Sequence, residues 1–89
     1  NELQVIPPVY LHPSAKVTRA TLGPHVSVGA DCTIDDARIA DSIIESGAVV
    51  ASVSLQGSFV GRQAVIRGRS PADPALTVNI GDTSSVVVK

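Results

Sequence analysis

The sequence predicts an all-β protein built as a single-stranded parallel β-helix, and three observations carry that prediction. A small residue (Ala, Ser, Val or Cys) stands two positions before each member of an aliphatic series. Three steps along the series make a repeat of 16 or 17 residues, and self-similarity at a fixed period indicates a repeat architecture. The aliphatic residues recur at steps of five or six: Leu11, Val17, Leu22, Val28, Ile34, Ile39, Ile44, Val50, Leu55, Val60 and Ile66.

The repeat predicts which side chains fill the interior. Side chains alternate between the two faces of a strand, so each aliphatic residue and its small companion point inward, and the residue between them points outward. Glycines 23, 29 and 61 directly follow series members, where the unusual backbone angles of a corner favour glycine. Stacking the coils gives three inward columns: Leu11/Val28/Ile44/Val60, Val17/Ile34/Val50/Ile66 and Leu22/Ile39/Leu55.

Three segments are expected along the chain. Residues 1–10 form an apolar lead-in or cap, and residues 11–68 form hexapeptide-like repeats of about three and a half coils. Residues 69–89 are expected to be a linker and C-terminal cap strands. Within that tail, alternation over 76–80 and the valines at 86–88 predict two strands that return over the last coil. A helical alternative fails because the i, i+3, i+4 pattern is missing and prolines interrupt the repeats.

The composition narrows the class of protein. One Phe, one Tyr and no Trp predict a narrow aliphatic core. The net charge of −1, with both signs mixed, argues against nucleic acid as a partner. A single Cys fits a reducing compartment, and no apolar run is long enough to span a membrane. The polar start followed by Pro7 and Pro8 does not resemble a signal peptide. We therefore expect a cytoplasmic domain, and the start at Asn1 rather than Met suggests a piece of a longer protein.

Several stretches resemble known families. Residues 10–17, YLHPSAKV, resemble the opening coil of hexapeptide-repeat domains, and residues 22–29, LGPHVSVG, are similar to their IGPxVSIG repeat. Residues 41–44 and 76–85 resemble the C-terminal domain of sugar-1-phosphate nucleotidyltransferases, in particular the long form related to glucose-1-phosphate thymidylyltransferase. This resemblance implies that the β-helix is left-handed.

The same resemblance implies a division of labour in the parent protein. In that family a Rossmann-like N-terminal domain carries catalysis, with a Gly-rich loop and acidic residues for Mg²⁺. This chain has no G-x-G-T-R segment, so no catalytic residue can be carried over to it. We expect a non-catalytic oligomerisation or regulatory domain without a cofactor of its own. Its expected partners are the catalytic domain and further copies of itself, and Mg²⁺ is expected only in the catalytic domain.

The alternative function is a fragment of a hexapeptide-repeat acyl- or acetyltransferase. Some of those enzymes use a histidine as general base, and His25 is the better candidate of two, the other being His12. Such enzymes usually extrude a loop between coils, whereas every step of the series is five or six residues. Zinc requires at least three protein ligands, so two histidines fall short within one chain. Two surface histidines at corners are the simpler interpretation.

The remaining candidate sites have plain structural interpretations. Cys32 takes an inward position between Ala15 and Ala48, which predicts a buried filler. An acidic run could hold a cation, but its members fall at outward or corner positions where Asp supports turns: Asp31, Asp35, Asp36 and Asp41. Three arginines could receive a phosphate or could form an exposed basic edge: Arg62, Arg67 and Arg69.

The outward positions predict a contact surface. One outward column contains Tyr10, Ile43 and Phe59, and Val49 and Val65 occupy the next column. A soluble monomer rarely exposes such a stack, so we expect self-association through these five residues. The resemblance to hexapeptide proteins implies a homotrimer, with a dimer as the second possibility.

Overall fold

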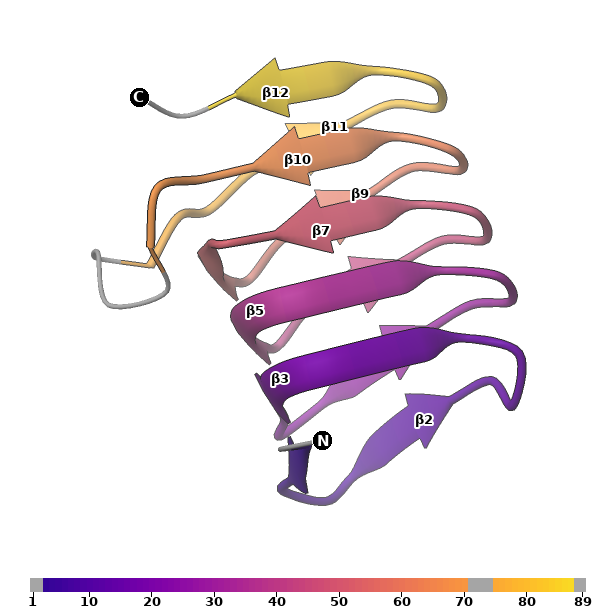
Figure 1. Cartoon of the computed structure of the whole chain (residues 1–89), viewed down its shortest axis with the longest axis vertical. Coiled ribbons are helices and arrows are strands. Elements are labelled where there is room, and N and C mark those ends of the chain that lie inside the picture. Colours follow the sequence, from indigo (N-terminus) through magenta and orange to yellow (C-terminus); the bar gives the residue numbers. More distant parts are fainter. Residues whose placement is uncertain (1–2, 71–74, 88–89) are drawn as a thin grey trace.

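The computed structural model describes residues 3–70 and 75–87, and these residues form short strands without any helix (Figure 1). No segment of this part of the chain is a helix long and apolar enough to cross a bilayer. The all-β prediction is confirmed. The strands are β1 (Gln4–Val5), β2 (Val9–Leu11), β3 (Lys16–Leu22), β4 (Val26–Val28), β5 (Thr33–Ala40), β6 (Ile43–Ile44), β7 (Val49–Ala51), β8 (Ser54–Gln56), β9 (Phe59–Val60), β10 (Val65–Arg67), β11 (Asn79–Ile80) and β12 (Ser85–Val87).

The strands stack in parallel on three sides of one coil. One side contains β2, β4, β6, β9 and β11, and the next contains β3, β5, β7, β10 and β12. β3 and β5 bend at Arg19 and Asp36, whose φ angles are 51° and 54°, and continue onto the third side. There the second half of β3 pairs with β1, and the second half of β5 pairs with β8.

The coil is left-handed, as the resemblance implied. In Figure 1 the strands β3, β5, β7, β10 and β12 run in front from right to left. The chain passes to the back on the left, and β9 and β11 return behind them toward the right. The path rises from the N-terminus to the C-terminus at the same time, and this sense of rotation defines a left-handed helix.

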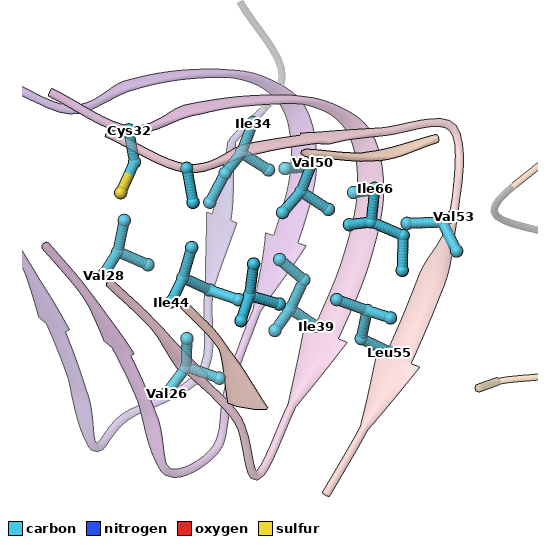
Figure 2. Packing of buried hydrophobic residues seen from close by; sticks show 14 of the residues in the cluster. Val26, Val28, Cys32, Ile34, Ile39, Ile44, Val50, Val53, Leu55 and Ile66 are labelled. Carbon is cyan, nitrogen blue, oxygen red and sulfur yellow. The ribbon is translucent and has the colours of Figure 1, made fainter. Parts of the chain in front are cut away.

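The predicted columns form the core. The register aligns Ile34 with Val50 and Val50 with Ile66, and all three side chains are fully buried. Figure 2 shows Ile34, Ile39 and Ile44 pointing inward from three different strand segments. Most of the small companions are buried with them, as expected when one bulky and one small side chain fill each side.

The glycines after the column residues have two different roles. Gly23 has a φ of 111°, so it adopts the unusual angles that the sequence predicted. Gly29 and Gly61 do not have positive φ values. Glycine is needed at these positions because the next coil lies close. A Cβ added at Gly29 would lie 2.8 Å from the Ser46 nitrogen, and one added at Gly61 would lie 2.5 Å from the Gly81 carbonyl carbon. The explanation from backbone angles is therefore wrong for these two positions.

The helix is longer than three and a half coils, with about five turns, and its last strands are not a returning cap. β11 pairs in parallel with β9 and β12 with β10, while Leu76 bridges to Leu55. β10 ends at Arg67, and the chain is again part of the stack at Leu76, as the strands β11 and β12 show in Figure 1. The tail extends the stack because Leu76, Val78 and Ile80 continue the inward positions. Residues 71–74 and Val88 lie outside the described residues.

Candidate assembly surface and predicted site residues

One side of the coil carries an apolar column on its outer surface. Register pairing aligns Tyr10 with Ser27, Ser27 with Ile43, and Ile43 with Phe59 on β2, β4, β6 and β9. Tyr10, Ile43 and Phe59 are 57%, 46% and 36% exposed, whereas Ser27 is half-buried. We call these four residues the aromatic column. The structure thus brings together three of the five predicted contact residues.

The other two predicted contact residues lie on a different side. Val49 and Val65 pair with each other in β7 and β10, and both are half-buried. Their column begins with Lys16 and Thr33, which are exposed polar residues. The structure therefore separates an apolar aromatic column from a mixed column on the neighbouring side.

Two surface hollows flank Ile43. One has a volume of about 380 Å³ and lies between Tyr10 and Ile43, above Ser27, with His25 at its edge. The second, of about 410 Å³, lies between Ile43 and Phe59 and reaches Asp41. Along the aromatic column, large side chains therefore alternate with hollows. Such a surface is better suited to binding another protein than to binding a small ligand.

His12 is held within its own corner. Its Nδ1 accepts hydrogen bonds from the Ser14 backbone N–H at 3.1 Å and from the Ser14 hydroxyl at 2.8 Å. The Ser14 hydroxyl in turn accepts the Asp31 N–H at 2.9 Å, which ties two coils together. Because both Ser14 groups donate to Nδ1, the neutral imidazole carries its proton on Nε2. These contacts give His12 a structural role.

His25 lies at another corner, with its side chain exposed. Its backbone is left-handed (φ 60°), and its N–H donates to the Pro8 carbonyl at 2.8 Å. The corner that follows β10 lies above Asp36 and Ser52 of the preceding coils, and neither histidine lies there.

Cys32 is fully buried at its predicted inward position. Its thiol donates to the Glu45 carbonyl at 2.9 Å. Burial raises the pKa of the Cys32 thiol above its ordinary value of 9.0, because removal from water disfavours the thiolate. The residue behaves as a small hydrophobe, not as a nucleophile.

The charged candidates are distributed over corners. Asp31, Asp36 and Asp41 have positive φ angles, which agrees with a role in turns. Arg19 forms an ion pair with Asp35 of the next coil, in which two guanidinium nitrogens donate to the carboxylate and the shortest distance is 2.8 Å. Arg62 pairs with Asp82 at 3.3 Å. Within the described ranges, no group of three His, Cys, Asp or Glu side chains could hold a metal ion.

Sequence reasoning missed two features. The small-residue pattern predicts only that Ser42 and Ser58 point inward, but their hydroxyls also link successive coils by hydrogen bonds. The sequence pattern did not pair His25 with Asp41, although they are 16 residues apart and stack at one corner. The repeat length itself was the signal that could have found the second feature.

Comparison with known proteins finds two relatives. No family model matches the chain, and no solved structure matches it. It is 36% identical over 83 residues to a probable mannose-1-phosphate guanyltransferase of Schizosaccharomyces pombe, covering 83% of this chain and 20% of that protein. The chain is a homologue of sugar-1-phosphate nucleotidyltransferases. A second relative of this nucleotidyltransferase homologue is a glucose-1-phosphate thymidylyltransferase of Streptomyces griseus, 27% identical over 82 residues, covering 91% of this chain and 23% of the relative.

This chain corresponds to only part of its relatives. It spans about a fifth of the length of the curated proteins that it matches. The match covers most of this chain, so the similarity follows the coiled repeats themselves. The β-solenoid of the structure is consistent with the β-helix domain that the resemblance implied.

Proposed function

We propose that this chain is the non-catalytic C-terminal assembly domain of a nucleotidyltransferase that forms nucleotide-activated sugars from a sugar 1-phosphate and a nucleoside triphosphate. The observation that carries the proposal is the similarity of nearly the whole chain to a short part of two such enzymes. The two relatives differ in both sugar and nucleotide, so the proposal extends to the reaction class only.

The shape of the domain supports an assembly role. Its interior is filled by the aliphatic columns, which leaves the outer sides of the coil to meet other molecules. The strand-built sides present extended surfaces with shallow hollows, whereas small-molecule sites are usually concave and enclosing. The aromatic column offers an apolar surface for self-association, and the buried free Cys32 agrees with a cytoplasmic location.

Magnesium belongs to the rest of the parent protein in this proposal. The resemblance implies Mg²⁺ for nucleotidyl transfer in the catalytic domain, and the proposal assigns no catalytic step to this chain.

The proposal is tested by activity of the separate parts. The purified chain, incubated with mannose 1-phosphate and GTP, or glucose 1-phosphate and dTTP, with Mg²⁺, should release no pyrophosphate. A longer parent protein that includes this chain should release pyrophosphate with at least one sugar and nucleotide pair. Pyrophosphate release by the chain alone would contradict the proposal. Release of coenzyme A from acetyl-CoA, lost in His25→Ala, would support the acyltransferase alternative instead.

A further inference from the structure

The aromatic column has an ordered pattern of sizes. Going from β2 to β9, its residues are large, small, large and large: Tyr10, Ser27, Ile43 and Phe59. Ser27 lies at the bottom of the hollow of about 380 Å³ between Tyr10 and Ile43. Neighbouring levels are about 4.8 Å apart, the spacing of paired strands. If a second copy of the column is turned end for end, Tyr10 of one copy faces Phe59 of the other, and Ile43 faces Ser27.

The two edges of this side differ in charge. At one edge His25 and Asp41 occupy the same corner of consecutive coils, because each stands two residues before the aligned pair Ser27 and Ile43. At the other edge, Glu45 follows β6 at the Ile43 level. Both His25 and Asp41 are exposed, and each borders one of the two hollows.

We propose that a second copy of this chain docks on the aromatic column with its helix axis reversed. This inference rests on the assembly role proposed above. The two-fold axis runs along the strand direction, midway between the Ser27 and Ile43 levels. Ile43 of each copy then enters the hollow above Ser27 of the other, and Tyr10 meets Phe59 of the other copy at both ends. Such self-complementarity is what a two-fold interface requires.

The same two-fold axis also pairs His25 with Asp41 at the edge of the interface. A two-fold axis along the strands places like edges together and exchanges the Ser27 and Ile43 levels. His25 of each copy therefore faces Asp41 of the other, which gives two equivalent contacts between an imidazole and a carboxylate. Such pairs at the rim of an interface fix its register.

An axis parallel to the helix does not fit this surface. It brings equal levels together, so Ser27 faces Ser27 and the hollows meet each other empty. In the face-to-face case it also places the edge with Asp41 against the edge with Glu45, which opposes two carboxylates at one level. The residues favour reversed packing over the three-fold arrangement that the resemblance implied.

The size of the domain can be compared with the area that a stable dimer buries. Standard interfaces bury about 800 Å² on each partner. That is about one sixth of the accessible surface of the domain, which is 4896 Å². An interface of standard size therefore needs only a minor part of the surface of the domain.

A charge exchange tests the reversed geometry. His25→Asp and Asp41→His each spoil the paired contact, whereas the double variant restores it with the partners exchanged. Both positions have left-handed backbone (φ 60° and 51°), which Asp and His tolerate better than most residues. At low ionic strength we expect each single change to raise the dimer dissociation constant by up to about five-fold, the upper range for exposed side-chain pairs. The double variant should return to the wild-type value.

Filling the hollow between Tyr10 and Ile43 is an independent test of the reversed geometry. Ser27→Leu should weaken the dimer because Ile43 of the other copy loses its space, while Thr33→Leu on the neighbouring side should not. Circular dichroism must show that every variant keeps its strand content. A mass of three copies, a double variant no tighter than the single ones, or a tighter dimer with Ser27→Leu would each overturn the reversed geometry. A monomeric wild-type chain would contradict the assembly role itself, which separates the two failures.

Discussion

The Ser42 hydroxyl accepts a hydrogen bond at 3.1 Å from the backbone N–H of Ser58, one coil further along the helix. It also donates to the Ala40 carbonyl at 2.7 Å, so it links two coils inside one corner. Ser58 repeats the arrangement with the N–H of Val78, at 3.0 Å. The inward serines therefore satisfy backbone groups that the corner geometry would leave without a partner.

Removing this link should destabilise the coil. Ser42→Ala leaves the buried Ser58 N–H without an acceptor, which costs about 1–3 kcal/mol. Chemical denaturation measures the loss, and Ser46→Ala at an exposed corner is the matched control. Equal stability of the two variants would show that the Ser58 N–H finds another acceptor.

The inward columns should not tolerate charge. Ile34→Asp or Val50→Asp places a carboxylate in a fully buried position, and we expect a loss above about 4 kcal/mol, enough to unfold the domain. Thr33→Asp on the same strand points outward and should melt close to wild type. Thermal melting by circular dichroism compares them, and a folded Val50→Asp would contradict the register.

Two glycines with positive φ should respond differently to alanine. Gly57→Ala meets no neighbouring atom and should cost about 1–2 kcal/mol, the price of a left-handed backbone. Gly23→Ala would place its Cβ on the Ile6 carbonyl oxygen as well, so its loss should be clearly larger. Denaturation midpoints measure both. A cost at Gly23 no larger than at Gly57 would mean that residues before β2 do not pack on this corner.

Cys32 should make stability depend on alkaline pH. Its pKa is raised in the folded state, so the unfolded chain loses the thiol proton first, near pH 9.0. The contribution of the protonated thiol to the free energy of unfolding is therefore complete below that pH and declines as the pH rises above it. Cys32→Ala should show a shallower decline between pH 8 and 10 in denaturant titrations. Parallel curves for the two proteins would contradict the burial of the thiol.

The period of the sequence was enough to predict the core but not the length of the helix. Ile34, Val50 and Ile66 follow the five-or-six step, and a one-residue error would have turned them outward. Leu76 follows Ile66 by ten residues and not by five or six, so the series stopped at Ile66. Extending the series past this interval would have required knowing that Leu76 bridges to Leu55.

The candidate surface was only partly predictable. Alternation placed Tyr10, Ile43 and Phe59 outward on one side, and the register confirmed that they share a column. Alternation cannot show the depth of the hollow at Ser27, because that depth depends on how the side chains around Ser27 are arranged in space. The pairing of hydroxyls with backbone groups at Ser42 and Ser58 likewise depends on corner geometry.

Self-association through the aromatic column is tested most directly by the molar mass of the purified chain in solution, measured by light scattering for wild type and Phe59→Glu. We expect the wild type at twice the single-chain mass of 9.1 kDa, and the variant at 9.1 kDa with unchanged circular dichroism. Thr33→Glu, on the neighbouring side, should remain dimeric. A wild-type mass of 9.1 kDa, or an unfolded Phe59→Glu, would contradict the assignment of this column as the contact surface.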